Sequence, residues 1–300
     1  MSASLRMVVT GTTGKIARSL CQRVAADGVE VVAVGRPSFD LARPDSIAPV
    51  IRAARPDVLV SAAGYTTVEQ AETEPELANA INVRGAQALA ECARDLGIPI
   101  IHLSSAYVFD GLQPTPYREH DPARPVGSYG RSKLMGERAV AQAHPQHVIL
   151  RLSWVYSPFG RNFVTAMLRQ AERDSEVRVV KDQTGNPTAA TEIADSIVAI
   201  GRRLASGDLP PDRYGIFHLA APCLLTPAAF ATLIFDLSAA CHGPTAKVAP
   251  IPQAEYVSGF RRPANIALDS SKIADTYGIP LPSLDVPLRA CIEQILEQRT

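Results

Sequence analysis

The sequence predicts an α/β fold of the Rossmann type, with a doubly wound parallel sheet and a smaller C-terminal α/β lobe. Short apolar runs alternate with segments of helical length and pattern through the first two thirds of the chain, which is typical of strand–helix–strand units. The first run opens into a glycine turn that leads directly into a helix. Such an alternation predicts parallel strands joined by right-handed crossovers.

Composition describes an ordinary globular protein. The 300 residues are 46% apolar and 20% charged, with a formal net charge of zero. A neutral chain is not expected to bind nucleic acid or an anionic membrane surface, and no apolar run is long enough to span a bilayer. Residues 1–6 lead into a strand without a signal peptide, so we expect a cytoplasmic protein. The five cysteines lack the spacing of a metal site, and we expect no metal.

The first strand, residues 5–10, ends in a glycine turn that predicts a dinucleotide site. Gly11 allows the tight turn and Gly14 lets the backbone approach a pyrophosphate closely. The helix that follows, residues 16–26, supplies free N–H groups and a partial positive charge at its start. We therefore expect cofactor contacts from residues of this turn: Gly11, Thr13, Gly14, Lys15 and Ile16.

The second strand, residues 30–34, is followed by Gly35 and Arg36. An enzyme that uses NAD usually carries an acidic residue here to hold the ribose 2′-hydroxyl. This chain offers Arg36 instead, whose guanidinium suits a 2′-phosphate. We therefore predict NADPH as the cofactor; NADH and a merely solvated Arg36 stay open as alternatives. Asp40 and Leu41 continue the same loop and are also expected at the cofactor.

The third strand, residues 57–62, runs into Ala62, Ala63 and Gly64. Small residues at the carboxyl end of a strand let a flat cofactor pass close to the backbone, although a plain tight turn has the same pattern. A helical region in two pieces covers residues 75–96. The fourth strand, residues 99–105, then ends in Ser104 and Ser105.

Tyr129 and Lys133 stand four residues apart in a segment with helical character, so their side chains lie on one face. Ser105 is brought in by a separate strand end. A phenol, an ammonium and a hydroxyl together can donate a proton. We expect the positive charge of Lys133 to lower the pKa of Tyr129 from its reference of about 10, toward the range of a general acid or base. A chance pair on a helix surface is the alternative.

The second half of the chain continues the alternation less regularly. A proline-rich loop, residues 113–126, leaves the carboxyl end of the fourth strand, where substrate crevices form. Trp154, the single tryptophan, falls near the end of the next strand. We expect strands at 148–156, 177–180 and 215–220, a turn at 182–188, and helices at 162–173, at 191–204, after Thr226 and from Pro287 onward.

Taken together, these motifs resemble the dTDP-4-dehydrorhamnose reductase family, a branch of the extended short-chain dehydrogenase/reductase superfamily. The resemblance spans nearly the whole chain, and the order and spacing of the segments are far more specific than any one motif. The matching segments are Gly11-x-x-Gly14-x-x-Ala17, residues 55–58, 62–66 and 104–111, Tyr129-x-x-x-Lys133, residues 151–156, Asn162-Phe163, Asp182-Gln183-x-Gly185-x-Pro187-Thr188 and Arg262-Pro263-x-Asn265.

This resemblance implies NAD(P)H-dependent reduction of the 4-keto group of a dTDP-linked 6-deoxy sugar. By analogy, Tyr129 donates the proton, Lys133 holds the nicotinamide ribose and Ser105 binds the carbonyl oxygen. The substrate would be lined by Tyr65, Ser105, Ala106, Tyr107, Trp154, Asn162 and Arg262, the last of these facing the diphosphate. We expect residues 1–156 and 177–222 to form the NAD(P)-binding domain, and residues 157–176 and 223–300 the substrate-binding lobe.

Two departures from the family pattern stand out. Ala106 replaces an aspartate that usually follows the catalytic serine, which puts substrate identity in doubt more than reaction type. Some members also dimerise around a magnesium ion held partly by an acidic residue of the first helix, where this chain has Ser19. The chain is therefore expected to be a monomer or a homodimer without a structural metal.

Two other functions stay open. The regulatory subunit of methionine adenosyltransferase is similar to this family and binds NADP without catalysis, but a binding module has no need of Ser105, Tyr129 and Lys133 together. An epimerase or dehydratase acting on a UDP- or GDP-sugar is the other alternative; a tightly held, non-exchanging cofactor would indicate it.

Overall fold

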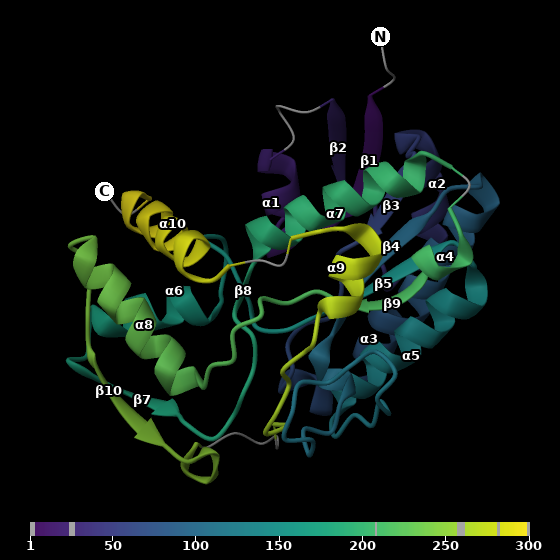
Figure 1. The fold of residues 1–300 in the computed structure, drawn as a ribbon. Helices are drawn as coiled ribbons and strands as arrows, with labels where there is room; N and C mark the ends of the chain where they lie inside the picture. The colour runs from purple at the N-terminus through teal and green to yellow at the C-terminus, as the bar shows by residue number, and fades with distance from the viewer. Residues whose placement is uncertain (1–3, 24–27, 208, 257–261, 281–282, 299–300) are drawn as a thin grey trace.

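The computed structural model describes residues 4–23, 28–207, 209–256, 262–280 and 283–298. Six parallel strands form the central sheet in the order β2–β1–β3–β4–β5–β9 (Figure 1). This arrangement confirms the predicted doubly wound α/β fold. The strands are β1 (Leu5–Thr10), β2 (Val29–Val34), β3 (Val58–Ser61), β4 (Ile100–Ser105), β5 (His147–Leu152) and β9 (Gly215–His218).

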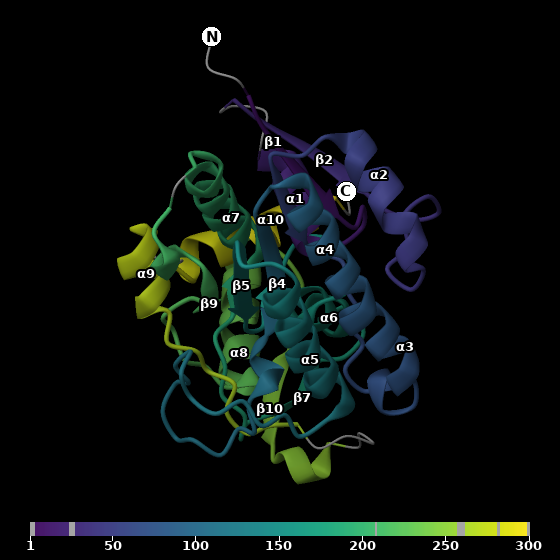
Figure 2. The same ribbon diagram turned by 90° about the vertical axis from the view of Figure 1, so that its right-hand side faces the viewer.

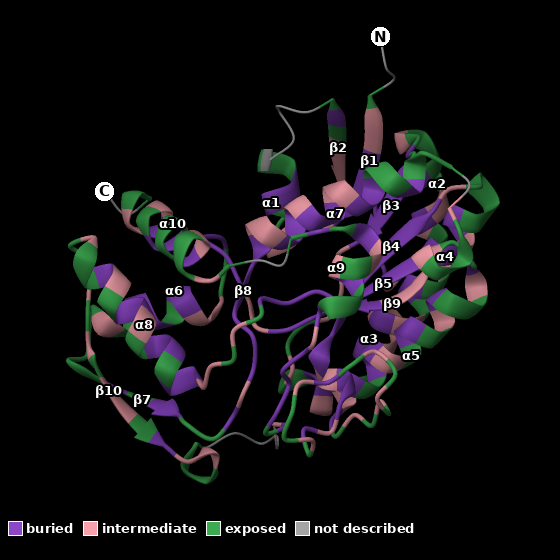
Figure 3. Ribbon diagram, viewed as in Figure 1, coloured by how far each residue is buried: buried purple, intermediate pink, exposed green. Residues whose placement is uncertain are grey.

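Helices cover both faces of this sheet, which explains why its central strands are buried almost throughout (Figure 3). One face packs on α1 (Lys15–Arg23), α7 (Ala190–Ala205) and α9 (Ser271–Tyr277). The opposite face packs on α2 (Ile47–Ala54), α4 (Ala86–Leu96) and α5 (Ser128–Ala143). Figure 2 shows α4 and α5 running beside each other along that face.

A second apolar cluster forms to the left of the sheet in Figure 1. Its elements are α6 (Phe163–Ala171), β7 (Glu176–Val180), α8 (Pro227–Ala240), β10 (Lys247–Ile251) and α10 (Asp285–Glu297). In this region β7 pairs in parallel with β10, and β6 (Val155–Tyr156) pairs with β8 (Thr188–Ala189). The division into a dinucleotide-binding domain and a substrate-binding lobe stays a prediction.

Most predicted elements are present within a few residues of their expected ends; the predicted end of the first helix, Ala26, lies outside the described residues. Thr226 does cap a helix, since its Oγ1 accepts a hydrogen bond from the Ala229 N–H. The strand expected at residues 148–156 is instead split in two. Trp154 adopts a positive φ of 38°, which no extended strand can contain, so β5 ends at Leu152 and β6 begins at Val155.

The helical region expected in two pieces is one run with an irregular centre. A π-helical turn, Ala80–Gly85, joins α3 (Pro75–Asn79) to α4. This turn brings Gly85 against the preceding loop, where an added Cβ would lie 2.5 Å from the Leu41 carbonyl oxygen. Among the described residues, no helix is both long and apolar enough to cross a bilayer.

Candidate active site

The loops after β1 and β3 meet at the carboxyl edge of the sheet, where the strand order changes direction. Thr10 ties them together, because its Oγ1 accepts hydrogen bonds from the backbone N–H groups of Ala62 (3.0 Å) and Ala63 (2.9 Å). Gly11 has a φ of 93°, and a Cβ there would lie 3.5 Å from that of Ala63. Parallel α/β sheets bind ligands at such a switch point.

The glycine turn leaves room for a close ligand. A Cβ added to Gly14 would meet nothing within 4 Å, and Thr13 beside it is exposed. Lys15 and Ile16 are half-buried at the start of α1, and burial lowers the pKa of the Lys15 ammonium. Free N–H groups and open space at a helix start suit a pyrophosphate, so the turn fits the predicted dinucleotide.

The loop after β2 carries the other predicted cofactor residues. Arg36 is exposed beyond the end of β2, and Asp40 is half-buried, with its Oδ1 accepting a hydrogen bond from the Ala42 N–H (3.0 Å). Leu41 is buried against the π-helical turn. Gly64, after β3, lies close to the side chain of Asn82. The three loops therefore border one edge of the sheet, as the sequence predicts.

Ser105, Tyr129 and Lys133 converge, although they come from different elements. The Tyr129 and Ser105 side chains are hydrogen-bonded. One turn further along α5, Lys133 Nζ donates a 2.6 Å hydrogen bond to the carbonyl oxygen of Leu103. All three side chains are buried. The structure thus brings together the phenol, the ammonium and the hydroxyl that the sequence predicts at a single site.

The expectation about the pKa of Tyr129 is wrong. Burial raises it to about 12, and the hydrogen bond from Ser105 offsets only part of that rise. Burial also lowers the pKa of Lys133 to about 8, against the opposing charge of Glu137. Desolvation disfavours the charged form of each group and is the largest cause of both shifts. The pocket therefore holds Tyr129 as a neutral phenol, able to donate a proton.

Tyr107 and Arg262 lie on the outer side of Tyr129. The rings of Tyr107 and Tyr129 meet edge to face with centroids 5.7 Å apart. The charge of Arg262 acts on Tyr107, and its guanidinium is held by Glu69 at 2.8 Å. Tyr65, also expected at the substrate, donates its hydroxyl to Glu74 at 2.9 Å. A cation and two further phenols thus lie near Tyr129 and Ser105.

The other predicted substrate residues differ in accessibility. Trp154 is half-buried and packs over Gly185, where a Cβ would come within 2.6 Å of the indole. Asn162 caps α6 through its Oδ1, which accepts from the Val164 N–H at 3.1 Å. Ala106 is completely buried. In the structure Asn162 therefore caps a helix, and Ala106 is not accessible from the surface.

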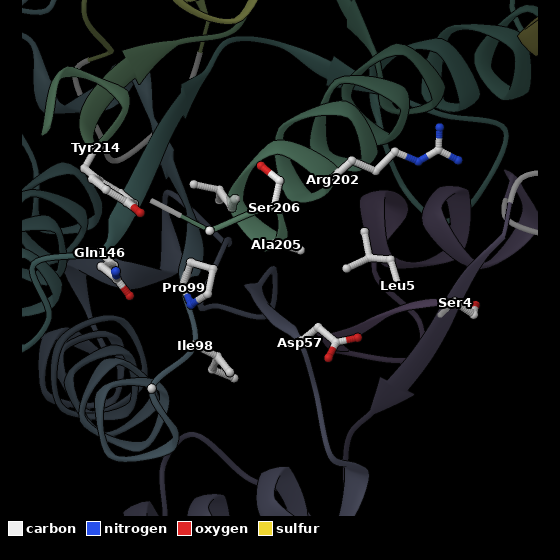
Figure 4. A pocket seen from close by; sticks show the side chains of 13 residues that line it. Ser4, Leu5, Asp57, Ile98, Pro99, Gln146, Arg202, Ala205, Ser206 and Tyr214 are labelled. Atoms are coloured by element: carbon white, nitrogen blue, oxygen red, sulfur yellow. The ribbon is translucent and has the colours of Figure 1, made fainter. Parts of the chain in front are cut away.

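A pocket of about 530 Å³ lies at the opposite end of the sheet (Figure 4). Asp57, Pro99, Gln146 and Tyr214 line it, and they precede or begin the parallel strands. Ligands of such sheets bind beyond the carboxyl ends of the strands. Ser105, Tyr129 and Lys133 also lie at that other edge, which is therefore the candidate active site.

Three residues at the site escaped the sequence analysis. Glu137 follows Lys133 by four positions and is buried with Arg151. Asn82 Oδ1 accepts from the Tyr65 N–H, while its Nδ2 donates to Ser132 on α5. Glu72 accepts from the Ser128 N–H at the start of α5. The repeated spacing of four in Tyr129, Lys133 and Glu137 is the one signal that could have indicated Glu137.

Fold and site together define the class of the protein: an oxidoreductase of the short-chain dehydrogenase/reductase type. The family model described as RmlD substrate binding domain matches residues 5–297, and the chain belongs to this family. A dTDP-4-dehydrorhamnose reductase of Sinorhizobium fredii is 47% identical over 97% of this chain and 98% of its own length.

Solved structures agree with that assignment. A dTDP-4-dehydrorhamnose reductase of Clostridium acetobutylicum superposes with a TM-score of 0.87 at 26% identity, covering 98% of this chain and 99% of its own. The Bacillus anthracis dTDP-4-dehydrorhamnose reductase, solved in complex with NADP, gives 0.86 at 27% identity over 98% and 99% of the two chains.

Proposed function

We propose that this protein uses NADPH to reduce the 4-keto group of a nucleotide-linked 6-deoxy sugar, with dTDP-4-dehydrorhamnose as the substrate. The observation that carries the proposal is the buried, hydrogen-bonded pair of Tyr129 and Ser105 with Lys133 one turn away. The 47% identical relative bears the name of that reductase.

The residues present fit a dinucleotide at the glycine turn, and NADPH would supply a hydride there. Tyr129 donates its phenolic proton to the sugar oxygen as the carbonyl carbon is reduced. Ser105 holds that oxygen by a hydrogen bond, and the charged Lys133 stabilises the negative charge that Tyr129 carries once it has given up its proton. The neutral state of Tyr129 in its buried site suits this direction of proton transfer.

The sugar nucleotide would lie over Tyr107 and Trp154, with Tyr65 nearby. Arg262 would face the diphosphate. It would give up its ion pair with Glu69 and bind a phosphate instead, since a guanidinium binds carboxylate and phosphate in the same bidentate way. Ala106 and Asn162 would shape this crevice from behind, given the burial of the first and the capping role of the second.

The direct test is NADPH oxidation by the purified protein against a panel of nucleotide-linked ketosugars, beginning with dTDP-4-dehydrorhamnose. We expect turnover with that substrate and a much lower kcat/KM with UDP- or GDP-linked analogues. Turnover only of an analogue would correct the substrate. A tightly held cofactor that survives purification, without net NADPH oxidation, would instead favour an epimerase or dehydratase.

Arg36 should set the choice of cofactor. It is exposed after β2 and available to a 2′-phosphate. Arg36→Ala should lower kcat/KM for NADPH by about 10-fold or more, the loss of one charged hydrogen bond, while kcat/KM for NADH stays unchanged. Steady-state kinetics with both cofactors measures this. A preference of the unmodified protein for NADH would reject the role assigned to Arg36.

We expect kcat/KM to fall at basic pH because Lys133 loses its proton there. Its pKa of about 8 means that the ammonium is charged below that pH and loses its proton above it. Tyr129, with a pKa of about 12, does not titrate in this range. We therefore expect activity to decline above about pH 8. Full activity up to pH 10 would contradict the assignment.

A further inference from the structure

Three consecutive residues of β4 hold three side chains of α5 that are spaced four apart. The Leu103 carbonyl oxygen accepts from Lys133 Nζ, Ser104 Oγ donates to Glu137 Oε1 at 2.5 Å, and Ser105 bonds to Tyr129. Two of these three hydrogen bonds involve Lys133 and Tyr129, to which a catalytic role is already assigned. The middle one involves Glu137, to which no role has yet been assigned.

Glu137 is also anchored to β5. Its two carboxylate oxygens accept a bidentate pair from Arg151, with Nε to Oε1 at 2.9 Å and Nη2 to Oε2 at 2.7 Å. Both side chains are at least 97% buried. Arg151 in turn lies over the ring of Phe109, 5.0 Å from its centroid. Glu137 therefore joins the catalytic helix to two strands through charge-assisted hydrogen bonds that fix its position along the sheet.

We propose that Glu137 is a positioning residue for the reaction: it fixes α5 against the ends of β4 and β5 and supplies the negative charge that faces Lys133. This inference rests on the proposed reductase function and names a group that does not touch the substrate. A bidentate pair has one good geometry, so α5 cannot slide or rotate without breaking it. Tyr129 thereby stays at Ser105.

The charged and titratable groups around Lys133 are few in the described part of the chain. Glu137 is the charge that opposes burial in setting the pKa of Lys133. His102, on β4, is buried, and its pKa is held well below 6.5, so it stays neutral near pH 8. Tyr129 is neutral there as well, and Arg151 is matched by Glu137. Removing the carboxylate charge would leave Lys133 without its opposing charge and the buried Arg151 guanidinium without its partner.

The test uses the full chain and Glu137→Gln, which keeps the side-chain shape but removes the charge. We expect the basic limb of the kcat/KM profile to move to lower pH by about one unit or more, the effect of losing a nearby opposite charge. The pH at which NADPH affinity weakens should move in the same direction, and this binding readout does not depend on turnover. Glu119→Gln is the matched control, since Glu119 accepts a hydrogen bond from the His218 N–H instead; its profile should match the unmodified protein.

A loss of stability in the variant would not by itself shift the kcat/KM and NADPH-binding profiles to lower pH. A folded Glu137→Gln protein with an unmoved basic limb and unmoved NADPH profile would overturn the inference, whatever its Tm. If that variant does not fold, Glu137→Gln combined with Arg151→Gln removes both buried charges. The double variant should still show a limb at lower pH, and an unchanged limb would again overturn the proposal. If the unmodified protein reduces none of the ketosugars, the proposed function fails, while the NADPH profile still tests Glu137.

Discussion

Replacing the phenol of Tyr129 in Tyr129→Phe should lower kcat by about two to four powers of ten, the usual loss when a general acid is removed. The ring stays in place because it packs edge to face on Tyr107, so only the proton donor and the hydrogen bond to Ser105 are lost. Single-turnover and steady-state NADPH oxidation measure the effect.

Two further measurements separate chemistry from folding in that variant. NADPH should bind to Tyr129→Phe with unchanged affinity, because the glycine turn and Lys133 remain. Tyr277→Phe is a matched control: Tyr277 is a fully buried tyrosine on α9 whose hydroxyl donates to the Arg213 carbonyl oxygen. It should retain normal turnover. Near-normal kcat in Tyr129→Phe would reject the proton-donor role.

Adding a single methyl group to the catalytic helix should be nearly as damaging. A Cβ at Gly130 would lie 2.1 Å from the Tyr107 carbonyl oxygen and 2.9 Å from Pro125 Cβ, and both neighbours belong to the loop that follows β4. Gly130→Ala must therefore push α5 away from that loop. We expect Tm to fall by about 5 °C or more, and kcat/KM by about 100-fold as Tyr129 leaves Ser105.

Gly14→Ala gives the comparison for that variant. A Cβ at Gly14 meets nothing within 4 Å, so its Tm should match that of the unmodified protein, while NADPH binding weakens because the methyl group occupies the ligand's space. Differential scanning calorimetry and a binding titration distinguish the two outcomes. A Gly130→Ala protein with unchanged Tm and activity would contradict this prediction, because the loop would then have moved to accommodate the methyl group at little cost.

The fold, and the meeting of the candidate catalytic side chains at one site, could be predicted from the sequence because each depends on local patterns. Alternation of apolar runs specified the parallel sheet, and the glycine turn lay where a strand meets a helix. The spacing of Tyr129 and Lys133 placed both on one helix face. Ser105 was recognisable because it ends a buried strand.

The rest depends on burial and on contacts between distant segments, which a local pattern does not carry. The pKa of Tyr129 was predicted in the wrong direction because the sequence shows the neighbouring charge but not the loss of solvent. The strand break at Trp154 follows from a backbone conformation paired with Gly185, thirty-one positions away. The contacts of Arg151 and Ser104 with Glu137 join segments that are distant in the sequence, so no local pattern indicated them.

The π-helical turn at residues 80–85 has a consequence for length variation in this segment. It holds one residue more than an α-helical path would need, and both flanking helices are docked, α3 and α4 each against α5. Deleting one residue there would convert the turn to a regular α-helix and leave α3 and α4 close to their present positions on α5. Asn82 lies inside the turn and would still lose its hydrogen bonds to Tyr65 and Ser132. A single-residue deletion in this segment should therefore preserve the fold while removing the support that Asn82 gives to the site.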